Sequence, residues 1–158
     1  MSTNLVPKTP LPFEIPTLAE HLNSNDHLAL IIRAHLYVEA ILIRHIETVV
    51  VNKQEFDSAK LQFAAKLKLA VALGKVDQAD SGALKTLNKL RNDFAHDLTT
   101  QLQEQDELDL YNTFSKRQRT FAEHLGRTPQ MVYIGRLRAD LMALISATNE
   151  GPNNDNNA

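Results

Sequence analysis

The stretch NKLRNDFAHDL, residues 88–98, brings three chemically capable side chains close together: Arg91, Asn92 and His96. A guanidinium binds phosphate through a planar fork of donors, an imidazole titrates near neutral pH, and a carboxamide both donates and accepts hydrogen bonds. Asn92 and His96 are four residues apart, so a helix would place them one turn apart on the same side. These residue types suit the binding of a phosphate-bearing ligand.

The same part of the chain carries apolar residues at helical spacing, namely Leu84, Leu87, Leu90, Phe94 and Leu98. At about 100° per residue they form one stripe that faces a core, and Arg91 falls at its margin. Asn88, Asn92 and His96 follow on the flank beside this stripe. Ala95 lies among them and leaves room for a ligand to approach the backbone.

The segment RNDFAH, residues 91–96, fits an R-x4-6-H motif with Asn in the favoured second position, and the chain thereby resembles the HEPN superfamily of helical bundles. The form RNxFAH is most similar to the mannitol-operon-repressor group and to uncharacterised bacterial proteins. The resemblance covers about residues 25–146, where a long apolar helix with an embedded acid precedes the motif helix. It implies a metal-independent endoribonuclease that acts as a homodimer, with two motifs lining one RNA-binding cleft.

The resemblance also implies catalytic roles. His96 would act as general base or acid at the ribose 2′-hydroxyl or the leaving 5′-oxygen, Arg91 would bind the scissile phosphate, and Asn92 would orient the imidazole. Such enzymes include toxin and defence ribonucleases, so a nucleotidyltransferase-like antitoxin is a possible partner. The alternative is a catalytically inactive dimeric interaction module or a transcription regulator similar to the mannitol operon repressor. A purely structural interpretation is also open, in which Arg91 is a helix-margin arginine and His96 a C-terminal histidine favoured by the helix dipole.

The long apolar helix expected over residues 26–51 carries His35 and Glu39 inside its apolar arc, four residues apart. A buried carboxylate needs a partner, because an unpaired buried charge costs several kcal/mol. We therefore expect Glu39 within salt-bridge reach of Arg91, directly or through His35, either to hold Arg91 toward phosphate or as a structural pair. His45 is expected to be a packed histidine. The breadth of the arc indicates a helix that is central or shared with a second subunit.

A basic segment follows an acidic one in the C-terminal half, and its members are Lys116, Arg117, Arg119, Arg127, Arg136 and Arg138, with Glu123 opposing. A segregated basic region can track a nucleic-acid backbone. The candidate RNA-binding residues are Lys116, Arg117 and Arg119. A solvated helix face is the alternative interpretation.

Capping and termination signals predict an all-α fold, an antiparallel HEPN-like bundle of five to six helices. Four prolines indicate an extended arm over residues 1–16, followed by one helical domain over residues 17–148 and a disordered tail over residues 149–158. Six helices are expected. The first begins at a Thr17 cap, the second covers residues 26–51, and the third runs from Asp57 or Ser58 to Gly74. The fourth runs from Asp80 or Ser81 to about Asp97, the fifth covers residues 105–126, and the sixth begins at Thr128 and Pro129.

The 158-residue chain has no cysteine and a formal net charge of −2. The missing cysteine excludes a disulfide framework, a thiolate metal site and a cysteine nucleophile, and it fits a reducing compartment. No signal-peptide core and no apolar run of membrane-spanning length is visible. We expect a cytoplasmic protein with no membrane attachment. No Gly-rich phosphate loop or zinc-binding helix is visible either, so no metal or other cofactor is expected.

Overall fold

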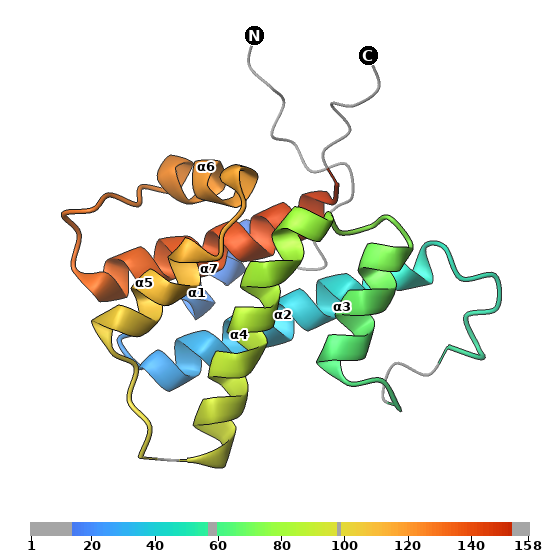
Figure 1. Ribbon diagram of the computed structural model, residues 1–158, viewed down its shortest axis with the longest axis horizontal. Coiled ribbons are helices and arrows are strands. Elements are labelled where there is room, and N and C mark those ends of the chain that lie inside the picture. Colours follow the sequence, from blue (N-terminus) through green and yellow to red (C-terminus); the bar gives the residue numbers. More distant parts are fainter. Residues whose placement is uncertain (1–13, 57–59, 98, 153–158) are drawn as a thin grey trace, which may run out of the picture.

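The computed structural model describes residues 14–56, 60–97 and 99–152, and within them the chain forms seven α-helices and no β-strand (Figure 1). The helices are α1 (Ile15–His21), α2 (His27–Glu47), α3 (Phe63–Ala72), α4 (Gln78–His96), α5 (Glu104–Asn112), α6 (Lys116–His124) and α7 (Tyr133–Glu150). The prediction of an all-α fold is confirmed. The helices outnumber the predicted five to six, because one predicted helix is divided in two.

The central helix of the bundle is α2. It packs against α3, α4 and α7, and Figure 1 shows α4 crossing in front of it. At its N-terminus Asp26 is the N-cap, and its carboxylate accepts a hydrogen bond from the backbone N–H of Ala29. Its fully buried apolar residues include Leu30, Ile31, Ala34, Val38, Leu42 and Ile46. This central position accounts for the broad apolar arc without a second subunit.

The first helix begins earlier than predicted. α1 starts at Ile15 after an N-cap at Glu14, so the predicted Thr17 cap is wrong. Pro16 lies in the first turn, where its missing N–H removes no intrahelical bond and its fixed φ favours helix. The predicted extended arm therefore cannot reach residue 16, and residues 1–13 of it lie outside the described residues.

The next two boundaries also differ. α2 ends at Glu47, whereas the sequence pattern extends it to Val51. α3 begins at Phe63 and is shorter than predicted. The predicted caps of that helix, Asp57 and Ser58, lie outside the described residues. The fourth helix begins near its predicted start and ends close to its predicted end, so the motif segment is helical as expected.

The predicted helix over 105–126 is two helices, α5 and α6. A capping box begins α6, because Ser115 Oγ accepts from the Gln118 backbone N–H at 3.1 Å and the Gln118 side chain accepts from the Ser115 N–H at 2.9 Å. Phe114, in the turn, is buried. Ser115 Oγ also donates to Asp80 Oδ1 of α4 at 2.6 Å. The turn is thus fixed by contacts to another helix, which a local pattern does not reveal.

The last helix begins at Tyr133, so the predicted start at Thr128 and Pro129 is wrong. The backbone N–H of Met131 bonds to the carbonyl of Thr128 at 3.2 Å, so these residues form a separate turn before the helix. A proline suits the first position of such a turn as well as that of a helix. Thr128 and Pro129 therefore begin a turn and not a helix.

The C-terminal boundary of the bundle is also later than predicted. Asn149 and Glu150 belong to α7, and Asn149 is buried, so the predicted tail over 149–158 begins too early. Gly151 ends the helix with φ +84°, a conformation that favours glycine. Residues 153–158 lie outside the described residues.

A buried ionic cluster joins α5, the loop after α6, and α7. Glu107 and Asp140 have no exposed surface. Glu107 accepts from Arg127 Nη2 at 2.9 Å and from Arg136 Nε at 3.0 Å, and Arg127 Nε lies 2.9 Å from Asp140 Oδ1. The guanidinium carbon of Arg127 is 3.4 Å from the centroid of the Tyr111 ring. Two members of the basic segment therefore act inside the bundle.

Candidate functional site

The predicted catalytic residues lie in the last two turns of α4. Arg91 and His96 are exposed, Asn92 is half-buried, and His96 is the last residue of the helix. The opposite side of the same turns is anchored in the core by Leu87 and Phe94, which are buried. The stripe-and-flank pattern of the sequence therefore produces an accessible polar surface on a fixed helix.

Arg91 and Asn92 are hydrogen-bonded to each other. Arg91 Nη1 donates to Asn92 Oδ1 at 3.2 Å, so the carboxamide orients the guanidinium. The resemblance instead assigns Asn92 to the imidazole. Among the described residues, the His96 side chain has no hydrogen bond or ion pair. The imidazole is thus accessible at the helix end, and the structure couples Asn92 to Arg91 rather than to His96.

One turn earlier, α4 is tied to α2 through His35 and Asn88. The two side chains are 3.0 Å apart between His35 Nε2 and Asn88 Oδ1, and the carboxamide oxygen can only accept, so Nε2 carries the proton. The imidazole also lies against the Phe63 ring, with centroids 4.3 Å apart. Burial lowers the pKa of His35, an effect that outweighs the opposing influence of Asn88 and Glu39. Neutral His35 is therefore a structural donor behind the motif.

The expected direct ion pair of Glu39 with Arg91 is wrong, whereas the expected contact of Glu39 with His35 is present. Glu39 Oε1 accepts from Lys66 Nζ of α3 at 2.9 Å, and Glu39 Oε2 lies 3.9 Å from His35 Nδ1. Lys66 is almost fully buried at 4% exposure, so the carboxylate neutralises an ammonium that water hardly reaches. Arg91 is near enough for its charge to act on His35, but it makes its side-chain hydrogen bond to Asn92. Lys66 was missed because only the fold brings α3 to this point.

His45 is a packed histidine, as expected. It is buried, and its Nε2 donates to the backbone carbonyl of Thr148 at 2.7 Å. Burial lowers the pKa of His45, and the bond to Thr148 opposes this effect without reversing it. The residue therefore connects α2 to the end of α7 and takes no part in the motif surface.

The three predicted RNA-binding residues differ in what they contact. Arg117 is occupied, because Nη1 donates to Asp80 Oδ2 at 3.1 Å and Nη2 donates to the Ala147 carbonyl at 3.1 Å. Arg119 lies over the Tyr111 ring, 5.2 Å from its centroid. Lys116 is exposed. The basic segment is therefore largely engaged within the protein rather than displayed as one free stripe.

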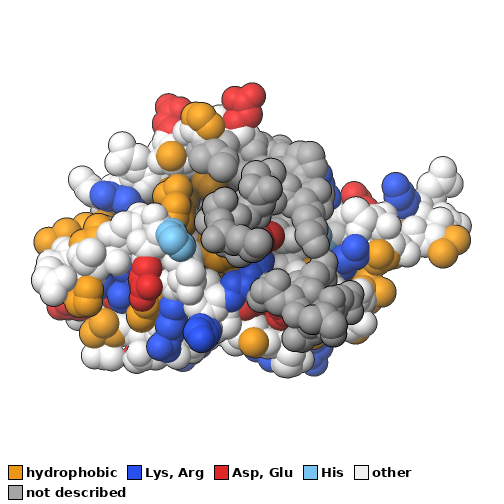
Figure 2. All heavy atoms as spheres, turned by 90° about the horizontal axis from the view of Figure 1, so that it is seen from above, with side chains coloured by type: hydrophobic (Ala, Val, Ile, Leu, Met, Phe, Trp, Pro, Cys, Tyr) orange, Lys and Arg blue, Asp and Glu red, His pale blue; other side chains and the backbone are white. Residues whose placement is uncertain are grey.

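The surface view agrees with this distribution. On the face seen in Figure 2, the Lys and Arg side chains lie in separate groups among acidic, apolar and uncharged side chains. A continuous basic track is not visible on that face.

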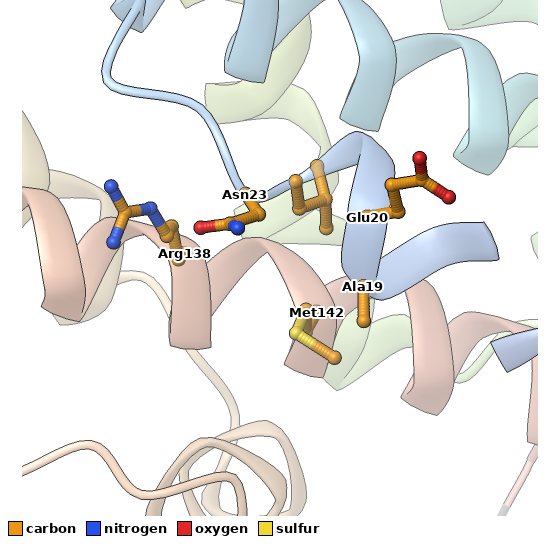
Figure 3. A pocket seen from close by; sticks show the side chains of 6 residues that line it. Ala19, Glu20, Asn23, Arg138 and Met142 are labelled. Carbon is orange, nitrogen blue, oxygen red and sulfur yellow. The ribbon is translucent and has the colours of Figure 1, made fainter. Parts of the chain in front are cut away.

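Two hollows of about 420 Å³ each were missed by the sequence analysis. One lies between α1 and α7, where Figure 3 shows Met142 and Ala19 facing each other, with Arg138 and Asn23 at one side and Glu20 at the other. The second lies at the C-terminal end of α4 and is lined by Asn25, Asp26, His27, Leu28, Phe94, Asp97, Thr100, Gln101, Leu102 and Tyr133. No short motif marks these positions, because each hollow is lined from separate parts of the chain.

Other site classes find no support in the part of the chain that the structure describes. No group of three or more His, Asp or Glu side chains there is placed to hold a metal ion. No described helix combines the length and the apolar character needed to cross a bilayer. Comparison with family models, with curated proteins and with solved structures found no match for the chain.

Proposed function

We propose that the protein binds RNA as a homodimer and cleaves it as a metal-independent endoribonuclease of toxin or defence type. The observation that carries this proposal is the surface of α4, where Arg91 and Asn92 are hydrogen-bonded to each other and the His96 imidazole has no partner among the described residues. All three side chains are accessible there. The RNDFAH resemblance to HEPN proteins supplies the reaction class, and the rigid attachment of α4 through His35 supports it.

The reaction is an internal transfer at phosphorus. The ribose 2′-oxygen attacks the adjacent phosphorus, a P–O2′ bond forms, and the P–O5′ bond breaks. A general base takes the 2′-hydroxyl proton and a general acid gives a proton to the leaving 5′-oxygen. Arg91 would bind the non-bridging oxygens, on which negative charge increases in the transition state. The products are a 2′,3′-cyclic phosphate and a 5′-hydroxyl.

The need for both a base and an acid favours a second copy of the chain. Each chain offers one motif histidine, His96. Two copies of α4 facing one cleft would supply one imidazole for each role, together with two Arg91 guanidinium groups. Leu36 on the outer side of α2 is 61% exposed and would gain from burial in such a dimer.

The deciding experiment is incubation of the purified protein with total RNA in EDTA. We expect cleavage, with cyclic phosphate and 5′-hydroxyl ends, and its loss in His96→Ala and Arg91→Ala. His124→Ala is the matched control, because His124 is likewise exposed and is the last residue of its helix, α6. Intact RNA under all conditions, with a folded protein, would reject the enzyme.

The internal use of basic residues favours a second candidate, an interaction module or transcription regulator without catalysis. Arg117 and Arg136 both bind carboxylates of the same chain, which leaves little free positive charge for RNA in their segment. In that case His96→Ala changes neither RNA integrity nor growth, while loss of the Arg91 surface weakens a protein complex. If the partner in that complex is a nucleotidyltransferase-like antitoxin, the ribonuclease is favoured instead.

A further inference from the structure

The hollow at the end of α4 lies beside the motif and has a defined construction. It is bounded by the N-terminus of α2, the end of α4, residues 100–102 and the first residue of α7, Tyr133. Its edge includes Asp97, which directly follows His96 in the chain. Its volume of about 420 Å³ is sufficient for a nucleoside-sized ligand.

The lining of this hollow combines apolar and aromatic side chains with polar ones. Phe94 and Leu102 are buried at 4% exposure each. The rings of Tyr133 and His27 meet edge to face, with centroids 5.5 Å apart and planes at 67°. The Tyr133 hydroxyl lies 3.5 Å from His27 Nε2, and both rings are half-buried. Flat aromatic side chains at a partly open hollow are the surfaces on which nucleobases stack.

The rim carries hydrogen-bond acceptors whose direction is fixed. Asp97 Oδ1 accepts from the backbone N–H of Thr99 at 2.9 Å and from its hydroxyl at 2.6 Å, and these bonds lower the pKa of Asp97. Asp26 Oδ1 accepts from the Ala29 backbone N–H at 3.2 Å. One oxygen of each carboxylate is thus used within the protein. Among the described residues, the lining holds two carboxylates and no Lys or Arg.

We propose that this hollow binds a nucleobase that carries an exocyclic amino group. The aromatic surfaces would contact the ring, and the carboxylates of Asp26 and Asp97 would accept from the two N–H donors of its exocyclic amino group. Uracil has no amino group and places two carbonyls beside its one N–H, which two carboxylates would repel. The same charges exclude a phosphate, so the sugar-phosphate must lie outside the hollow. The base can belong to a free nucleoside or to an RNA strand, and the RNA source rests on the proposed function.

The test is a titration of the ¹⁵N-labelled full-length protein with adenosine, guanosine, cytidine and uridine, followed by NMR. We expect shifts at residues around Tyr133 and Asp97 for the three amino-bearing nucleosides, with uridine weaker by about fivefold or more. Tyr133→Leu should weaken binding about tenfold through the lost ring contact, whereas Tyr133→Phe should retain it. Equal binding of all four nucleosides, or of none, overturns the proposal.

Charge variants make the test specific. Asp97→Asn keeps an acceptor for the Thr99 turn but removes the charge, so it should weaken binding of cytidine and adenosine. Asp93→Asn is the matched control, because Asp93 is exposed on α4 and does not line the hollow.

A second experiment adds arginine and its neutral analogue citrulline in parallel. Saturation by arginine but not by citrulline, without nucleoside binding, assigns an organic-cation site and overturns the proposal.

A short RNA distinguishes the two sources. If Asp97→Asn changes which nucleotide flanks the cut, the base belongs to the RNA substrate. If nucleosides bind but the protein without substitutions leaves RNA intact, the hollow binds free nucleosides. That result rejects the proposed ribonuclease and keeps the nucleobase site. Nucleoside binding should persist in His96→Ala, so failure of the catalytic proposal and failure of this one give different results.

Discussion

His35 and Asn88 are joined across two helices by one hydrogen bond of 3.0 Å, and the imidazole that donates it is 4% exposed. Removal of the acceptor leaves a buried N–H without a partner. We therefore expect Asn88→Ala to reduce the free energy of unfolding by about 1–3 kcal/mol. Urea unfolding at pH 7 measures this, with Lys89→Ala on the exposed side of α4 as the control.

The ion pair between Glu39 and Lys66 makes a second prediction. Glu39→Gln leaves the nearly buried ammonium of Lys66 without its carboxylate, while Glu39 itself is about one-third exposed and partly screened. We expect a loss of about 1–3 kcal/mol in stability. Lys66→Met in the same background should recover part of it, because the uncompensated charge is then gone. If Glu39→Gln abolishes RNA cleavage at unchanged stability, the carboxylate has a direct functional role instead.

The buried carboxyl pair of Asp140 and Glu107 predicts a pH dependence. Burial, with the neighbouring Glu107 carboxylate, raises the pKa of Asp140 to about 9 against the opposing influence of Arg127. Burial alone would raise the pKa of Glu107 as well, but hydrogen bonds from Asp140, Arg136 and Arg127 outweigh it and lower the pKa. In the unfolded chain Asp140 loses its proton above the ordinary pKa of 3.8, whereas in the folded protein it keeps this proton.

The sign follows from proton binding. Between pH 4 and 9 the folded state binds this proton and the unfolded state does not, so the contribution of Asp140 to stability falls as pH rises, by at most about 1.4 kcal/mol per pH unit. The window from pH 7 to 9 isolates the contribution of Asp140 from those of His35 and His45. The pKa values of these two histidines are lowered, so they change stability only as pH falls below their ordinary 6.5. Asp140→Asn should flatten the urea-derived slope in this window. An unchanged slope relative to exposed Asp109→Asn contradicts the protonated carboxyl.

Ser115 connects the turn between α5 and α6 to α4. Its hydroxyl accepts from the Gln118 N–H and donates to Asp80, so Ser115→Ala removes a helix cap and one hydrogen bond of a buried carboxylate. The expected loss is about 1–2 kcal/mol in unfolding free energy. Ser115→Thr keeps the hydroxyl and should remain close to the original stability. Equal stability of all three chains would mean that the capping box is not a determinant of the turn.

Local patterns predicted the elements whose determinants are local. α4 combines a regular apolar stripe with a polar flank, as helical periodicity predicts, and Arg91 and His96 are exposed on it. The turn at Ser115 was missed because Asp80, in a distant part of the sequence, takes part in it. A helical wheel gives the side on which a residue lies but not the neighbour that it meets.

The same limit explains the errors in the candidate site. Glu39 was correctly expected to need a cation, but the wheel could not show that Lys66 of α3 lies nearer than Arg91. The basic segment was read as a surface because its acidic partners, Glu107 among them, are distant in sequence. The hollow beside Tyr133 was missed for the same reason, since its walls come from four parts of the chain.

The bond from Arg91 Nη1 to Asn92 Oδ1 makes the last prediction, which concerns catalysis and rests on the proposed function. If Asn92 acts by orienting the guanidinium, Asn92→Ala lowers cleavage when Arg91 is present and has little further effect in Arg91→Ala. A double-mutant cycle on kcat/KM should then show a coupling of about 1 kcal/mol between these residues and near-additivity between Asn92 and His96. Coupling confined to Asn92 and His96 would restore the orientation of the imidazole as the role of Asn92. Both residues are at least partly exposed, so stability should change little and any loss of activity reports on the site.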